Sequence, residues 1–205
     1  SMREAAREII EGDFEDRIEL AARGARQELT WEAESLRGLL APLCQHDTFV
    51  DKAHLELDRA GGDVSALDPG VRIALRHFVP DQATALRLDE LSLVTGDGYV
   101  LGAEDVARIG TRDARLAAMI KAPSDSPPRM RATEQDELAS MEVHCTRSGH
   151  GVTVGLVGAR RIAPILERVG NAYGVRLSPI DPAEAPPPPS AEEVARVMDP
   201  GDVTG

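Results

Sequence analysis

Apolar residues recur every three or four positions through the first part of the chain, which is the period of an amphipathic helix. The stripe consists of Phe14, Ile18, Ala22, Ala25, Leu29, Leu36, Leu40 and Leu43. Residues 3–44 contain no proline before Pro42 and are rich in good helix formers. The pattern predicts one helix of about 60 Å, at a rise of about 1.5 Å per residue. Two helices broken near Gly24 or Gly38 are the alternative.

A weaker pattern between residues 45 and 84 predicts two short helices. The first, in DTFVDKAHLELDRAGG, is expected to end at Gly61-Gly62, because glycine commonly stops helices. The second, in DPGVRIALRHFVPD, is expected to lie between Pro69, which suits a first helical turn, and Pro80, which does not suit a helix interior.

The period then changes to the two-residue alternation of a strand. Leu86 and Leu88 alternate with polar residues, and so do Leu91 and Leu93. The sequence Gly96-Asp97-Gly98 follows, and glycine supplies the positive φ angles that a tight turn needs. Residues 86–103 are therefore predicted to form a hairpin, with the return strand beginning at Tyr99.

The rest of the chain predicts a further helix and a second hairpin. EDVARIGTRDARLAAMIKAP has helical spacing interrupted at Gly110, with Thr111 as the expected cap. Residues 123–137 have the proline, serine and charge content of a loop. ASMEVHCTR and VTVGLVGAR, separated by a turn at residues 148–151, predict a second hairpin. A helix ending at Gly174 and a fifth strand, VRLSPI, complete the pattern.

Five strands with mostly antiparallel neighbours, and helices set mainly on one side, indicate the α+β class. The predicted fold is a long N-terminal helix packed on a five-stranded antiparallel sheet. Residues 3–180 are expected to form a single domain, with the helix at 3–44 and the sheet core at 85–180. Residues 181–205, which contain a run of four prolines, are expected to form a Pro-rich acidic tail.

The charge of the chain excludes several classes of partner. The 205 residues carry a formal charge of −12, from 35 acidic and 23 basic residues. Binding to nucleic acid or to anionic lipid requires a positive surface, so neither is expected. No apolar run approaches the about 20 residues of a membrane helix. Ser1-Met2 is typical of residues left by removal of a tag, so the chain is expected to be a piece of a longer protein.

Motifs for catalysis are missing from the sequence. There is no GxGxxG followed by a helix, no GxxxxGK[ST] and no HExxH, so we predict no catalytic residues, no cofactor and no metal. Cys44 and Cys145 are too far apart in sequence for a CxxC motif. They are either two buried free thiols or, in an oxidising compartment, a disulfide.

The strand at residues 141–146 has two different faces. Met141, Val143 and Cys145 share one of them, which is the expected core side. Glu142, His144 and Thr146 share the other. This second face is either solvated or lines a pocket beneath a loop.

The order of elements resembles the extracytoplasmic Cache or PAS-like sensor domains of bacterial transmembrane receptors, over roughly residues 3–180. The long helix REAAREIIEGDFEDRIELAARGARQELTWEAESLRGLLAPL is similar to their membrane-proximal helix. The hairpin LDELSLVTGDGYVLGA is similar to their first strand pair, and VGLVGARRIAPILERVGNAYGVRLSPI to their closing strand, helix and strand.

The resemblance implies a signal-sensing domain of a sensor histidine kinase or related receptor, with a small-molecule pocket on one sheet face and no catalysis in this chain. It implies a periplasmic or extracellular position, with the membrane reached only through spans of the parent protein. A homodimer through the N-terminal helix is also expected. The rival classes are a soluble ligand-binding or enzymatic domain of a larger protein, and a dimerisation module with a degenerate pocket.

The expected pocket lies on the sheet face beneath the loop at residues 123–137. Arginine binds carboxylates and phosphates through paired hydrogen bonds, and neutral histidine accepts or donates near neutral pH. A small organic anion is therefore the expected ligand, with other small molecules as the alternative. The candidate ligand-binding residues are Tyr99, Arg112, Arg115, His144 and Thr146.

Overall fold

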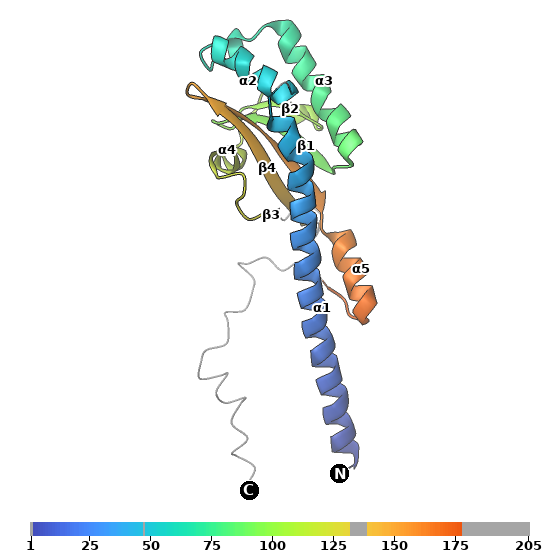
Figure 1. Ribbon diagram of the computed structural model, residues 1–205. Helices are drawn as coiled ribbons and strands as arrows, with labels where there is room; N and C mark the ends of the chain where they lie inside the picture. Colours follow the sequence, from blue (N-terminus) through green and yellow to red (C-terminus); the bar gives the residue numbers. More distant parts are fainter. Residues whose placement is uncertain (1, 47, 132–138, 178–205) are drawn as a thin grey trace.

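One long helix dominates the shape of the molecule (Figure 1). The computed structural model describes residues 2–46, 48–131 and 139–177, with side chains from residue 13 onward. Helix α1 (Met2–Leu40) is continuous over 39 residues, which confirms the prediction of a single helix. It passes directly into the 3₁₀ turn η1 (Ala41–Cys44), where Pro42 occupies the first turn. The end of α1 far from the sheet extends well beyond the rest of the domain (Figure 1).

Two further helices follow, as predicted. Helix α2 (Phe49–Arg59) is capped by the hydroxyl of Thr48, and α3 (Pro69–Leu86) by the carboxylate of Asp68. The prediction that α3 ends near Pro80 is wrong, because the helix continues to Leu86. Val79 and Ala83, on either side of the proline, are fully buried. Their packing offsets the cost of the backbone hydrogen bond that is missing because proline has no N–H group.

The sheet has five strands in the order β2-β1-β5-β4-β3, and all neighbours are antiparallel. The strands are β1 (Glu90–Thr95), β2 (Val100–Ala103), β3 (Arg129–Arg131), β4 (Ser140–Gly149) and β5 (Val152–Arg161). The α+β class and the five-stranded antiparallel sheet are therefore confirmed. The first two strands form one predicted hairpin, which begins at Glu90 and not at Leu86, because Leu86 is the last residue of α3. Strands β4 and β5 form the other.

The identity of the fifth strand differs from the prediction. Residues 175–177 of VRLSPI form no strand, and residues 178–180 lie outside the described residues, as does the expected tail at 181–205. The fifth strand is β3, inside the segment predicted to be a loop. Its three residues are too few for a periodic pattern, and it is held by pairing with β4 (Met130 opposite Met141).

The sheet is covered on both faces (Figure 1). Helices α1, α2 and α3 cover one face, which we call the α1 face, and bury the larger apolar core. Helix α4 (Ala114–Lys121) covers the other, which we call the α4 face, with a smaller apolar cluster. Asp113 caps α4, so the expected cap Thr111 is wrong; its hydroxyl instead donates to the Arg108 carbonyl.

The tight turn of the first hairpin requires glycine. Gly98 has φ +86°, and a Cβ at this position would lie 2.4 Å from the carbonyl oxygen of Asp113. The turn is therefore packed directly against the start of α4. In this way the hairpin positions the helix that covers the α4 face.

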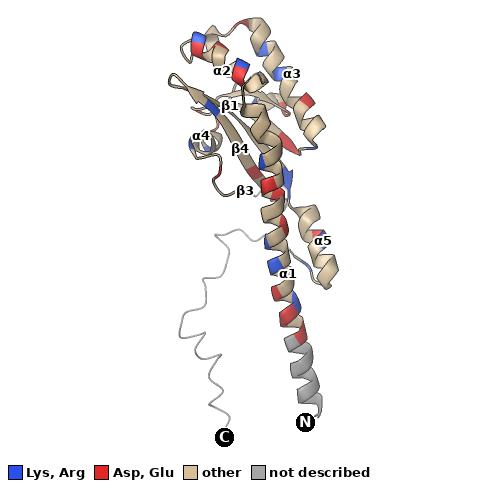
Figure 2. Ribbon diagram, viewed as in Figure 1, with Lys and Arg blue, Asp and Glu red and all other residues tan. Residues whose placement is uncertain are grey.

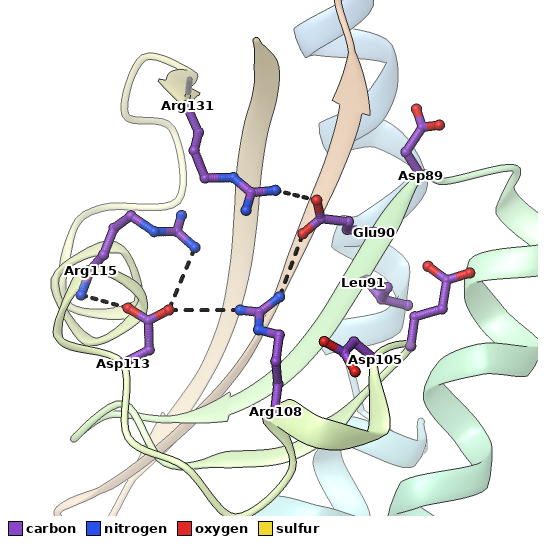
Figure 3. Close-up of a pocket in the computed structure, with 9 residues that line it drawn as sticks. Asp89, Glu90, Leu91, Asp105, Arg108, Asp113, Arg115 and Arg131 are labelled. Carbon is purple, nitrogen blue, oxygen red and sulfur yellow. Dashed lines mark hydrogen bonds and ion pairs between the residues drawn. The ribbon is translucent and has the colours of Figure 1, made fainter. Parts of the chain in front are cut away.

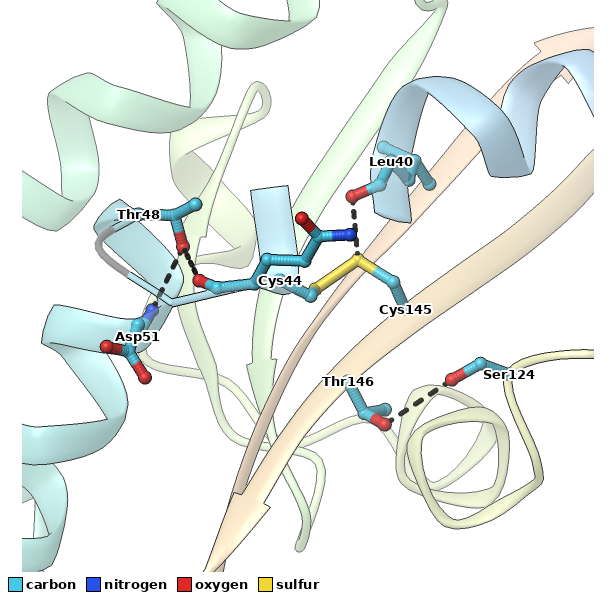
Figure 4. The surroundings of a disulfide bond; sticks show 8 residues. Leu40, Cys44, Thr48, Asp51, Ser124, Cys145 and Thr146 are labelled. Carbon is cyan, nitrogen blue, oxygen red and sulfur yellow. Dashed lines mark hydrogen bonds between the residues drawn. A yellow bond between two sulfur atoms is a disulfide. The ribbon is translucent and has the colours of Figure 1, made fainter. Parts of the chain in front are cut away.

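A disulfide joins Cys44, at the end of η1, to Cys145 on β4 (Figure 4). The two Cα atoms are 6.1 Å apart, and the residues are 101 positions apart in sequence. Of the two alternatives left by the sequence, the disulfide is the one found. It ties η1, which follows directly on α1, to β4.

Helix α5 (Ala163–Tyr173) packs beside α1 below the sheet (Figure 1). The predicted apolar stripe of α1 is thereby largely covered: Ala25 and Leu36 are buried, whereas Phe14 and Ile18, nearer its start, are 55% and 43% exposed. Charged residues of both signs lie along this part of α1 (Figure 2). No helix within the described residues is both long enough and apolar enough to cross a membrane.

Candidate functional site

A pocket of about 580 Å³ opens on the α4 face, near the end of the sheet where β1 begins (Figure 3). It lies between β1, the 3₁₀ turn η3 (Val106–Arg108), the start of α4 and β3. The lining residues are Asp89, Glu90, Leu91, Glu104, Asp105, Arg108, Asp113, Arg115 and Arg131. The volume is in the range of pockets that hold small molecules.

Strand register places two glutamates at the base of this region. Glu90 on β1 and Glu142 on β4 both pair with Ala159 on the intervening strand β5. Their side chains therefore stand on the same face, on strands about 10 Å apart at about 4.8 Å per neighbour. Arg131 on β3 reaches both of them, with an ion pair to Glu90 and one to Glu142 at 3.0 Å.

Two more arginines approach from the other side of the pocket. Arg108 comes from η3 and lies 3.5 Å from Glu90 and 3.7 Å from Asp113. Arg115, in the first turn of α4, lies 3.6 Å from Asp113 and forms an ion pair with Glu142. We call these six residues the ion-pair cluster: Glu90, Arg108, Asp113, Arg115, Arg131 and Glu142.

Glu142 is the most deeply buried member of the cluster, with 3% of its side chain exposed. Burial raises the pKa of Glu142 above its ordinary value, because a charged carboxylate loses its hydration. The nearby guanidinium groups of Arg115 and Arg131 oppose this effect without reversing it. The cluster therefore contains one carboxyl group that takes up a proton more readily than an exposed glutamate.

Three more carboxylates line the pocket. Asp89 and Asp105 lie on the side of Arg108 that faces away from Arg115 and Arg131 (Figure 3), and Glu104 also lines the pocket. Asp89 is held by Arg161 at 3.4 Å, and Asp105 caps η3. Chemically, the pocket offers both guanidinium donors and carboxylate acceptors, which suits binding of a small polar molecule.

The structure brings only one of the predicted ligand residues into this pocket. Arg115 lines it. Arg112 is 72% exposed and forms an ion pair with Asp97 at 3.0 Å, away from the pocket. Tyr99 packs against the large core of the α1 face.

His144 and Thr146 lie on the α4 face but do not line the pocket. The Nε2 atom of buried His144 is 3.0 Å from the carbonyl oxygen of Ala122. The hydroxyl of Thr146 is 3.5 Å from that of Ser124. Both therefore lie beneath the segment that follows α4. The alternative of a solvated face is wrong here, because Glu142 and His144 are both buried.

Sequence reasoning missed Glu90, Arg108, Arg131 and Glu142 as members of a site. The one signal for Glu142 was its charge at the polar position between Met141 and Val143, in a strand that alternates apolar and polar residues. A buried charge needs partners. The partners Arg108 and Arg131 carried no comparable signal among the many arginines of the chain.

Comparison with protein-family models and with curated protein sequences finds no match to this chain.

Proposed function

We propose that this chain is the extracytoplasmic signal-sensing domain of a membrane-bound bacterial sensor histidine kinase or related receptor. Its role is to bind a small molecule, a small organic anion being the first candidate, and to transmit that event without catalysis of its own. Its links to the membrane run only through spans of the parent protein.

The observation that carries the proposal is the position of β4 between the pocket and the long helix. Glu142 on β4 belongs to the ion-pair cluster on the α4 face. Cys145, three residues further along the same strand, faces the other way and is bonded to Cys44 in η1, which follows directly on α1. A displacement of β4 by a ligand would therefore reach η1 through one covalent link, and α1 through η1. A ligand acts in this way only if it binds two arrangements of the strand with different affinity.

The disulfide supports a position outside the cytoplasm. Structural disulfides form and persist in oxidising compartments such as the bacterial periplasm, and are rare in reducing cytoplasm. The Cys44–Cys145 bond closes a loop of about one hundred residues and joins two buried positions. It is therefore a structural link and not an exposed reactive pair.

We further propose that two copies associate through α1. Phe14 and Ile18 remain exposed where the apolar stripe continues beyond α5, and Trp31 is 62% exposed on the same helix. Tethering to a membrane would raise the effective concentration, so a weak interface would suffice. Ile18→Glu should shift the sedimentation profile towards monomer without lowering the melting temperature, and Glu15→Gln serves as its control. If the sedimentation profile of Ile18→Glu at high concentration equals that of the wild type, association through α1 is contradicted.

A receptor chimera tests the sensing role. Residues 3–180 would replace the sensor domain of a histidine kinase that drives a transcriptional reporter, and metabolite pools would be screened for a change in output. We expect the response to disappear in Arg131→Gln and to persist in Arg129→Gln, which alters an exposed residue of the same strand. The proposal would be contradicted if compounds stabilise the purified domain but none of them changes the reporter output.

A further inference from the structure

Glu142 occupies a special place in the ion-pair cluster. Among the described residues of the cluster, it is the carboxylate in contact with both Arg115 and Arg131. It thereby connects α4 to β3 through the two arginines, both of which line the pocket. The other charged groups acting on it are Glu90 from β1 and Arg108 from η3.

The charge of the pocket limits what can enter it. Three arginines and five carboxylates line the pocket, which gives a formal charge of 3 − 5 = −2. Glu142 beneath it adds one more negative charge. An anion entering alone would add further negative charge beside the buried carboxylate of Glu142, where Coulomb repulsion is stronger than in bulk water. Each arginine of the pocket, moreover, already faces a carboxylate.

Resting on the proposed role in small-molecule sensing, we propose that the pocket binds a small oxyanion together with one proton. Glu142 takes up the proton from solvent, and the anion takes the place of its negative charge beside Arg115 and Arg131. The net charge of the site is then unchanged by binding of a monovalent anion. No covalent bond forms or breaks apart from the O–H bond of the glutamic acid.

Several features make Glu142 the acceptor of this proton. The carboxylates that line the pocket border solvent, whereas Glu142 is buried and is more readily accommodated when neutral. Burial already raises the pKa of Glu142. Arginine pairs bind oxyanions through planar, two-pronged hydrogen bonds, and both guanidinium groups line the pocket (Figure 3). Because the two binding events are linked, protonation of Glu142 raises the affinity for the anion, and the bound anion raises the proton affinity of Glu142 by the same factor.

Calorimetric titration with methanesulfonate tests the coupling, since this monovalent oxyanion keeps its charge from neutral to mildly acidic pH. For the wild-type chain we expect an affinity that falls by about tenfold per pH unit above the pKa of Glu142, as for uptake of one proton. Titrations in buffers with different ionisation enthalpies should show about one proton taken up per anion bound. This second measurement needs no variant.

Glu142→Gln places a neutral side chain of the same shape in the cluster. It should bind methanesulfonate at neutral pH, with an affinity that no longer depends on pH and without proton uptake. Glu167→Gln, which removes an exposed carboxylate on α5, should behave as the wild type. Circular dichroism and the melting temperature verify that both variants are folded.

Three results would overturn the coupling: wild-type binding without proton uptake, an unchanged pH dependence in Glu142→Gln, or no methanesulfonate binding at any pH. Binding without proton uptake, or an unchanged pH dependence in Glu142→Gln, would exclude the coupling alone. If Arg131→Gln still abolishes binding in that case, the pocket remains the ligand site. The receptor chimera responds to any ligand class, so its failure would instead count against the sensing role itself.

Discussion

The two faces of the sheet are built on different physical principles. The α1 face is covered by three helices and carries the larger apolar core, in which a disulfide joins η1 to β4. The α4 face is covered by one short helix over a small apolar cluster, and beside the start of β1 it carries the ion-pair cluster. Burial of apolar side chains does not depend on their ionisation, whereas ion pairs respond to pH and are screened by salt. We therefore regard the α1 face as the scaffold and the α4 face as the responsive surface.

The largest effect should come from the scaffold. Leu36 on α1 is fully buried, and Leu36→Ala should lower the free energy of unfolding by about 2 to 5 kcal/mol through lost transfer energy and a cavity. Leu39→Ala, three residues away and 36% exposed, is the matched control and should cost less than about 1 kcal/mol. Urea denaturation measures both. Similar losses of unfolding free energy in the two variants would contradict the division of α1 into a buried and an exposed side.

The disulfide should give the next largest effect. Replacing Cys44 and Cys145 together by Ala should lower the free energy of unfolding by about 2 to 4 kcal/mol, because the crosslink restricts a long loop of the unfolded chain. Denaturation of the wild type with and without reductant offers the same comparison without a substitution. A double variant as stable as the oxidised wild type would show that the link contributes nothing to the scaffold.

A smaller loss is expected on the α4 face. Arg131→Gln removes two ion pairs, with Glu90 and Glu142, and should cost about 1 to 3 kcal/mol. The loss should be local, so hydrogen exchange should accelerate at residues 129–131 and at their partners on β4, and not on the α1 face. Exchange that accelerates equally on both faces would mean that the sheet responds as one unit.

The smallest effect is the dependence of stability on pH. Because the folded pKa of Glu142 lies above its ordinary value, the folded chain holds this proton more tightly than the unfolded chain. Its stabilising contribution is fully present below the ordinary glutamate pKa and is lost as pH rises through the folded pKa. The unfolding free energy of the wild type, relative to Glu142→Gln, should therefore fall as pH rises through that window. A difference that grows with pH would reverse the sign assigned to this group.

Sequence patterns revealed the scaffold far better than the responsive surface. The stripe on α1 and the alternation in β4 are local patterns, and they determine which side chains are buried on the α1 face. The pocket depends instead on contacts between distant segments: Arg131 meets Glu90 across 41 positions, and Arg115 meets Glu142 across 27. Contacts between such distant segments leave no periodic pattern in the local sequence. The same limit explains why the sequence predicts a loop where β3 lies, since β3 is defined by its pairing with β4.

Two neighbouring arginines provide the most direct test of the account. Arg115 lines the pocket and contacts Glu142, whereas Arg112, three residues earlier, is exposed and paired with Asp97. Methanesulfonate titration at mildly acidic pH should show at least about a tenfold loss of affinity in Arg115→Gln, the equivalent of one lost charged hydrogen bond of about 1.4 kcal/mol. Arg112→Gln should bind as the wild type. Equal affinities in the two variants, or a loss confined to Arg112→Gln, would contradict the assignment of the α4 face pocket as the ligand site.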